Sequence, residues 1–183
     1  GKPNTKSTSP KASSQSSLPE GRFLRITVPG DNKILTLNEV EIMSGGKNVA
    51  RSGKAKQSSL GSGGVASRGI DGNKNPDWNG GGQTHTDGSG SIAPWWEVDM
   101  GKSLAIDKIE VWNRSGYESR LNNFMVELLD ENRKKVFEKS KVRGAQRIVF
   151  DLKKKGEVTF LAYNGKKETP PATSSRKESV EVP

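Results

Sequence analysis

The stretch Ala105-Ile106-Asp107-Lys108-Ile109-Glu110-Val111 decides the fold class, because its apolar side chains fall mostly on one face of an extended strand. Similar short runs recur along the chain, and no segment shows a sustained helical period of apolar residues. Turn residues separate them, as in Pro29-Gly30-Asp31-Asn32. We expect strands at residues 22–28, 34–43, 95–100, 104–112, 124–129, 135–138, 147–152 and 158–163. Many short strands joined by loops predict an all-β sandwich or barrel.

Composition limits the domain organisation. The chain has 183 residues, and large apolar side chains are scarce at both ends. Residues 1–20 and 165–183 cannot bury enough apolar surface to offset the chain entropy lost on folding. We therefore expect a disordered linker at 1–20, one domain at 21–164 and a disordered tail at 165–183. The Ser- and Pro-rich start indicates a piece of a larger multidomain chain.

Cysteine is absent, which excludes disulfides and thiolate metal sites. Catalysis finds little support, because any nucleophile–base triad would depend on the only histidine, and no Gly-x-Ser-x-Gly elbow surrounds a serine. Gly101-Lys102-Ser103 lacks the upstream glycine of a phosphate loop. We expect a protein that is not an enzyme.

Positive charge dominates the chain, with a net charge of +9. Between Glu131 and Gly156, ten basic residues stand against three acidic ones, an excess of seven positive charges. Such a window is either a solvated strand-and-turn face or a patch that attracts polyanions. Neither a recognition helix nor a stacking motif accompanies the charge, so we expect no nucleic-acid partner.

A small polar binding site is predicted around His85. This histidine lies in a long polar segment, residues 53–90, and such a loop in a compact domain is functional or disordered; we favour a functional loop. Arg114 and Arg120 follow the end of a predicted strand. Imidazole and guanidinium groups are hydrogen-bonding groups that suit a polar ligand.

A second candidate site lies in Asp71-Gly72-Asn73-Lys74-Asn75-Pro76-Asp77, which collects oxygen ligands for a hard cation such as calcium. The stretch begins like an EF-hand loop. However, the EF-hand glycine is replaced by Pro76 and the final glutamate by Gly82, which excludes that motif. Two interpretations stay open: a different loop site that uses carbonyls and Asp71, or an Asx-rich turn held by its own side chains.

These segments together resemble a known family. The resemblance is carried by Gly69-Ile70-Asp71-Gly72-Asn73, Thr84-His85-Thr86, Pro94-Trp95-Trp96-Glu97-Val98-Asp99 and Asn113-Arg114 followed by Arg120-Leu121. In order and spacing they are similar to the fucolectins, which belong to the discoidin (coagulation factor V/VIII C-terminal) family of carbohydrate-binding modules. The resemblance covers about residues 21–152. It implies a discoidin-like jelly-roll β-sandwich that binds carbohydrate without catalysis.

For the sugar site, the resemblance implies that His85, Arg114 and Arg120 contact the ligand. The family's adjacent cysteines, which pack on the sugar, are absent here, and Tyr117 is the candidate for that apolar contact. The implied ligand is a fucose-type or related glycan. The basic surface suggests an anionic glycan, such as a sulfated one.

For calcium, the resemblance implies Asp71 and Asn73, together with a glutamate from a strand that matches Leu37-Asn38-Glu39-Val40-Glu41. The predicted ligands are therefore Asn38, Glu39, Asp71 and Asn73, with Arg68 and Gly82 as backbone contributors. In the family this strand lies near the C-terminal end of the domain. Its early position implies a circularly permuted sandwich, or else residues 21–43 finish a preceding domain.

A binding module of this kind implies an extracellular or periplasmic location. The alternative function is an adhesion or membrane-surface module that binds protein or phospholipid headgroups. Such modules present exposed apolar side chains on loop tips, and none is evident in residues 53–90. We therefore do not expect a membrane partner.

Overall fold

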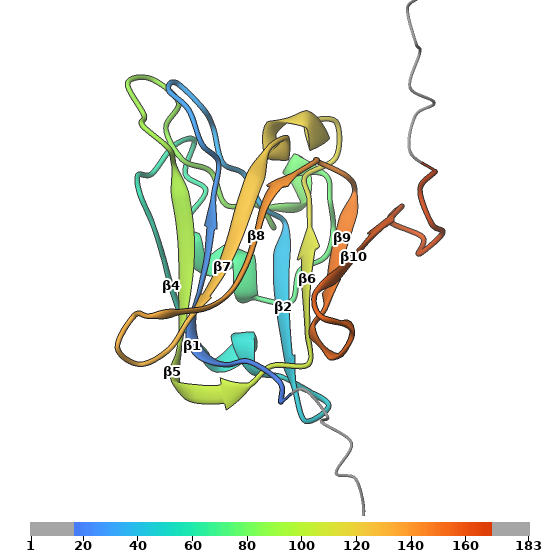
Figure 1. Ribbon diagram of the computed structural model, residues 1–183. Coiled ribbons are helices and arrows are strands. Elements are labelled where there is room, and N and C mark those ends of the chain that lie inside the picture. The colour runs from blue at the N-terminus through green and yellow to red at the C-terminus, as the bar shows by residue number, and fades with distance from the viewer. Residues whose placement is uncertain (1–16, 170–183) are drawn as a thin grey trace, which may run out of the picture.

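A computed structural model describes residues 17–169, which form two antiparallel sheets packed face to face (Figure 1). One sheet has the strand order β4-β5-β1-β7-β8 and the other β10-β9-β6-β2-β3. The strands are β1 (Glu20–Thr27), β2 (Glu39–Ser44), β3 (Lys47–Asn48), β4 (Lys54–Gln57), β5 (Trp95–Ala105), β6 (Lys108–Trp112), β7 (Phe124–Leu129), β8 (Lys135–Val142), β9 (Arg147–Asp151) and β10 (Glu157–Leu161). The predicted all-β jelly-roll sandwich is confirmed.

Short 3₁₀-helices lie in the connections between strands. They are η1 (Val49–Ser52), η2 (Ala66–Ile70), η3 (Trp78–Gly80), η4 (Glu118–Leu121) and η5 (Leu152–Lys154). Within residues 17–169, no helix has the length and apolar character needed to cross a membrane.

The two N-terminal strands lie inside the sheets. β1 pairs with both β5 and β7, and β2 pairs with β6 and β3. Residues 21–43 are therefore part of this sandwich and do not finish a preceding domain. The circularly permuted order stays a prediction.

The core lies between the sheets and is built from alternate strand residues. Leu24 and Ile26 of β1 and Ile109 of β6 are fully buried. Trp96 is also fully buried, and its indole nitrogen donates to the Ala66 carbonyl at 2.9 Å. Its neighbour Trp95 points to the outer face, where the Arg25 guanidinium carbon lies 4.2 Å from the ring centroid. The two tryptophans thus point to opposite faces, as strand alternation predicts.

The hydrogen-bonded structure continues past residue 164. Lys167 forms a β-bridge with Leu161, and Glu168 accepts a hydrogen bond from Arg143 at 3.3 Å. These pairings fix a polar segment that composition alone assigns to the tail. The other predicted linker and tail residues, 1–16 and 170–183, lie outside the described residues.

The segment Thr84–Thr86 takes the place of a strand at the loop end of the sandwich. The Thr84 and Thr86 amides donate to the carbonyls of Leu37 at 2.8 Å and Leu35 at 3.0 Å. In return, the Leu37 and Leu35 amides donate to the two threonine hydroxyls, each at 2.9 Å. Because hydroxyls replace backbone carbonyls as acceptors, the expected strand 34–43 becomes regular only at Glu39.

On its other side, the same segment lies against a glycine turn. The His85 amide donates to Gly64 at 2.8 Å, and the Gly61 amide donates to the His85 carbonyl at 2.9 Å. A Cβ atom on Gly64 would lie 2.5 Å from the backbone nitrogen of His85, so the close approach of the two backbones requires glycine. The Gln57 side-chain amide also donates to the His85 carbonyl, at 2.9 Å. The buried backbone is thus bonded on both sides, which fixes the position of His85.

We expect Gly64→Ala to lower the free energy of unfolding by roughly 1–3 kcal/mol, because the added methyl group overpacks the contact with His85. Urea unfolding measures this change. Ser62→Ala, two residues earlier at an exposed position, is the control and should leave stability nearly unchanged. Equal stability of the two variants would contradict the close packing of this turn.

Candidate functional site

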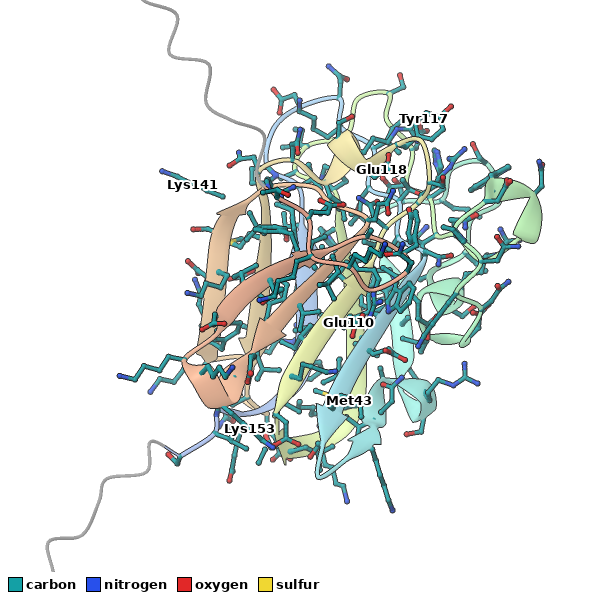
Figure 2. The ribbon with its side chains drawn as sticks, turned by 90° about the vertical axis from the view of Figure 1, so that its right-hand side faces the viewer. Met43, Glu110, Tyr117, Glu118, Lys141 and Lys153 are labelled. Atoms are coloured by element: carbon teal, nitrogen blue, oxygen red, sulfur yellow. The ribbon has the colours of Figure 1, made fainter. Side chains whose placement is uncertain are left out.

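The side chains predicted to contact sugar meet at one end of the sandwich. Arg120 Nη1 lies 3.3 Å from His85 Nε2. The guanidinium carbons of Arg114 and Arg120 each lie 4.2 Å from the centroid of the Tyr117 ring. Figure 2 shows Tyr117 at this end of the molecule, far from Lys153 at the other end. The structure therefore brings together all four residues, from loops that are distant in sequence.

Trp78 joins this cluster although it is not among the predicted sugar contacts. Its ring lies edge-on to His85, with the ring centroids 5.6 Å apart. The Arg114 guanidinium carbon lies 4.4 Å from the Trp78 ring, so this arginine packs against both Trp78 and Tyr117. In the sequence, Trp78 is distinguished only by its position directly after the Asp/Asn-rich stretch. Its contacts with His85 and Arg114 join residues that are distant in sequence, so spacing along the chain could not predict them.

Buried Asn113 positions the loop that carries Arg114. Its carbonyl oxygen Oδ1 accepts from the Arg114 amide at 2.8 Å, and its Nδ2 donates to the Glu118 carbonyl at 3.1 Å. The Ser115 amide donates to Pro76 at 2.9 Å, which ties this loop to the Asp/Asn-rich loop. The sequence pair Asn113-Arg114 thus combines an anchor inside the core with a donor at the surface.

Arg120 is held by the short helix η4. Leu121, the last residue of this helix, is fully buried and anchors it to the core. The Arg120 amide donates to the Tyr117 carbonyl at 3.0 Å. The arginine side chain therefore leaves the helix beside the Tyr117 ring and reaches His85.

The cluster is cationic and, among residues 17–169, has no counter-ion. In the part of the chain that the structure describes, neither Arg114 nor Arg120 has a carboxylate within ion-pair distance. The Arg114 Nε atom is buried without a hydrogen-bond partner. An orphaned buried donor is costly unless a ligand supplies an acceptor. The arrangement is therefore suited to a ligand with several oxygen acceptors.

His85 is neutral at physiological pH. It is 8% exposed, and burial lowers its pKa below the ordinary 6.5, with the charges of Arg120 and Arg114 acting in the same direction. Its Nδ1 lies 2.8 Å from the Thr86 carbonyl, which assigns the ring proton to Nδ1. Nε2 therefore presents a lone pair toward Arg120 and the ligand.

Two hollows flank the cluster. One, of about 540 Å³, is lined by His85 and Leu60; the other, of about 440 Å³, is lined by Arg120. Asn32 and Ile34 line both. The donor cluster thus lies where two openings meet, and each opening has the size of a small-molecule site.

The carboxylates predicted to bind calcium lie close together. Glu39 is fully buried, and both of its oxygens accept from the Gly72 amide at 3.1 Å, between Asp71 and Asn73. Burial raises the pKa of Glu39 to about 8. Among residues 17–169, no lysine or arginine makes an ion pair with this carboxylate. A buried carboxylate without a cation is costly, and a bound cation would remove that cost.

The amide side chains predicted for this site, Asn38 and Asn73, meet at Gly82. A Cβ atom on Gly82 would lie 3.1 Å from Asn38 Oδ1 and 3.0 Å from the Asn73 carbonyl oxygen. Gln83, which was not predicted, donates to Asn38 Oδ1 at 3.0 Å and leaves its own buried oxygen unpaired. The Arg68 side chain reaches the Gln83 carbonyl at 3.4 Å. The donor set consists of carboxylate, amide and carbonyl oxygens, which fits calcium.

The Asp/Asn-rich loop is also held by its own side chains. Asp71, Asn73, Asn75 and Asp77 each accept, through Oδ1, from the amide two residues further on. Among the described residues, no group of three or more His, Cys, Asp or Glu side chains could hold a metal by itself. Any cation here would therefore take most of its ligands from amides and carbonyls. The Asx-turn interpretation is correct and is compatible with a cation on the remaining oxygens.

Comparison with known proteins agrees with this architecture. A model of F5/F8 type C domains, described as NedA-like, galactose-binding domain, matches residues 68–161. Fucolectin-1 of Anguilla japonica is 41% identical over 73 residues, which are 37% of this chain and 40% of that protein. The chain therefore matches well under two thirds of that relative's length.

Two solved structures share the fold, each with a TM-score of 0.54 and 32% sequence identity. One is a histidine mutant of the lectin binding domain of lectinolysin complexed with Lewis b, where the match covers 60% of this chain and 78% of the other. The other is a Streptococcus pneumoniae fucose binding module, with 64% and 83% covered. The resemblance to fucolectin-like, discoidin-type modules is thus confirmed, and these modules are not enzymes. Since the family model spans about half of its length, the chain belongs to the NedA-like, galactose-binding domain family of F5/F8 type C domains.

Proposed function

We propose that the protein is a carbohydrate-binding module and that the cluster around His85 binds a fucosylated glycan. The observation that carries this proposal is the convergence of Arg114, Arg120 and neutral His85 with no counter-ion among the described residues. A sugar presents hydroxyl and ring oxygens that accept from guanidinium groups, and its hydroxyls can donate to His85 Nε2. The two solved neighbours, described as bound to Lewis b and as fucose binding, support fucose as the sugar.

The aromatic residues have separate roles in this proposal. The Tyr117 ring lies against both guanidinium groups, so it holds the two like charges together. Trp78 lies edge-on to His85 and supplies apolar surface for the C–H groups of the sugar. The two flanking hollows accommodate neighbouring sugars of a longer glycan. A sulfate ester on such a glycan is compatible with the uncompensated arginines and with the net charge of +9.

We further propose that Ca²⁺ binds next to Glu39 and Asp71. Side-chain oxygens of Asn38 and Asn73 and backbone oxygens of Arg68 and Gly82 complete this donor set. When bound, calcium supplies the positive charge that the buried carboxylate lacks. The Asp/Asn-rich loop then holds Trp78 and Pro76 in place, and through Pro76 the loop of Arg114. The cation pre-organises the sugar site without touching the sugar.

An extracellular or periplasmic location follows from the same proposal, because the glycans recognised by such a module are displayed outside the cytoplasm. The module would then target a larger protein to a glycan-bearing surface. Neither the location nor the larger chain is needed for the binding chemistry at His85.

A second candidate function, attachment to a membrane surface, has one observation in its favour. Leu60 and Ile92 are 60% and 80% exposed. The expectation that residues 53–90 carry no exposed large apolar side chain is therefore wrong at Leu60 and at Val65, which is 43% exposed. Liposome binding together with a silent glycan array would favour this alternative.

We expect His85→Ala and Arg114→Ala each to weaken glycan binding roughly ten- to hundredfold, because each removes a hydrogen bond that involves a buried or charged group. A glycan array followed by calorimetry with L-fucose measures this loss. Lys102→Ala removes one charge at the other end of β5 and serves as the control. Unaltered affinity in both site variants would exclude this location for the sugar.

Binding should also depend on pH through His85. The pKa of this histidine lies below its ordinary 6.5, so in excess calcium the affinity should fall as the pH is lowered through that pKa. Protonation would remove the acceptor at Nε2 and add a third positive charge beside two arginines. Calorimetry as a function of pH measures the effect. Affinity that rises on acidification would contradict the neutral imidazole.

Calcium should remove the effect of pH on stability. Glu39 has a folded-state pKa of about 8, against about 4.5 for the unfolded chain. Between these two pH values, the metal-free folded state therefore holds a proton on Glu39 that the unfolded chain has lost. Without calcium, stability should therefore fall as pH rises from about 5 to 8, by up to about 1.4 kcal/mol per pH unit. Melting curves in chelator and in excess calcium, between pH 5 and pH 8, measure this slope.

With calcium, stability should no longer fall over that range, because the bound cation favours the ionised carboxylate. Glu39→Gln should abolish the slope in chelator and remove the gain from calcium. Glu41→Gln, on the same strand but partly exposed and paired with Lys74, is the matched control. Melting curves that calcium leaves unchanged at pH 8 would remove the metal from the proposal.

A further inference from the structure

One face of the sandwich carries positive charge that neither proposed site uses. β8 is the last strand of one sheet and β10 is the last strand of the other. The two edges lie together, since a Cβ atom on Gly156, between β9 and β10, would lie 3.2 Å from Lys139 Cε of β8. The basic window found in the sequence therefore folds onto one pair of neighbouring sheet edges.

Four lysines on these edges are free of ion pairs. In the described part of the chain, no carboxylate lies within ion-pair distance of any of them; they are Lys139, Lys141, Lys154 and Lys155. Lys135, on the same strand, is by contrast paired with Glu127 and Glu138. On these two edges, the unpaired lysines thus lie on β8 and in the connection between β9 and β10.

The backbone at two of these lysines is left-handed. Lys141 has φ of 55° and Lys155 has φ of 54°, a conformation in which glycine or asparagine is the relaxed choice. The chain places lysine at both positions and accepts the strain.

We infer that Lys139, Lys141, Lys154 and Lys155 form a second binding surface, which takes a sulfated polysaccharide. Unpaired ammonium groups along a sheet edge attract a linear polyanion, and each contact releases counter-ions from it. Figure 2 shows Lys141 on the side of the molecule away from Tyr117, so both surfaces can be occupied together. This inference does not rest on the fucose proposal.

Sulfated polysaccharide is favoured over nucleic acid by the side chains that accompany the lysines. Single-stranded nucleic acid binding uses aromatic rings on which bases stack. Val136 is the exposed large apolar residue of β8, and Phe137 is half-buried against Gly156. The hollow of about 640 Å³ beside Lys155 is lined by the carboxylates of Glu20 and Asp130, so the polyanion would follow the lysines along the edges and not enter this hollow.

The experiment uses heparin as the sulfated polysaccharide and the full chain in three forms. The edge variant is Lys141→Gln, Lys154→Gln and Lys155→Gln, which leaves half-buried Lys139 in place. The control variant is Lys47→Gln, Lys54→Gln and Lys102→Gln. It removes the same charge from exposed lysines on the opposite edge strands β3 and β4 and on β5, which is next to β4. Melting curves establish that both variants fold.

The edge variant should elute from immobilised heparin at lower salt than the other two forms. The slope of its plot of log affinity against log salt should be shallower by roughly two to three, because each of the three lost lysine contacts removes slightly less than one released counter-ion. Replacing the same three lysines with arginine should restore wild-type retention. Neutral dextran should not compete for the protein.

Three results would overturn the inference. Equal loss in the edge and control variants would show attraction to net charge alone. If single-stranded DNA released the protein from immobilised heparin at a lower concentration than free heparin does, nucleic acid would be the partner. Self-association of the edge variant with unchanged heparin binding would show that these lysines only block pairing between sheet edges.

Discussion

The binding end of this molecule depends on the hydrogen bonding of one buried segment, Thr84–Thr86. A long polar loop enters the protein here, and its backbone groups need partners away from water. Leu35 and Leu37 supply them on one side, partly through the threonine hydroxyls, and the turn Gly61–Gly64 supplies them on the other. The side chain between the two threonines, His85, is thereby fixed in a buried, neutral state.

Around that histidine, the structure holds like charges together without neutralising them. Arg114 lies against Trp78 and Tyr117, and Arg120 lies against the other side of the cluster, between Tyr117 and His85. Aromatic faces attract guanidinium groups but leave their N–H donors free. Packing within the protein therefore fixes the positions of these donors before a sugar binds, which lowers the entropy cost of binding. The calcium proposed at Glu39 would not touch the sugar and would act on the loops that carry Trp78 and Arg114.

Sequence patterns predicted the sheets better than the site. Alternation marked β6 because its apolar residues face a core, whereas Lys54–Gln57 has no such alternation and forms β4 only through backbone pairing with β5. The resemblance to fucolectins placed His85, Arg114 and Arg120 in one site, where the structure brings them together. Trp78 and Gln83 were not predicted, because their roles come from neighbours across space. The ordered segment around Glu168 was missed for the same reason, since its partner Arg143 is distant in sequence.

The most direct test follows the side-chain N–H signals of the arginines and the ring nitrogens of His85 by nuclear magnetic resonance during a titration with L-fucose. A sugar bound at this cluster should shift the Arg114 Nε–H and His85 Nε2 resonances along one saturable curve, while His85 Nδ1 keeps its proton toward Thr86. Saturable fucose binding that leaves the Arg114 and His85 resonances unchanged would contradict the site.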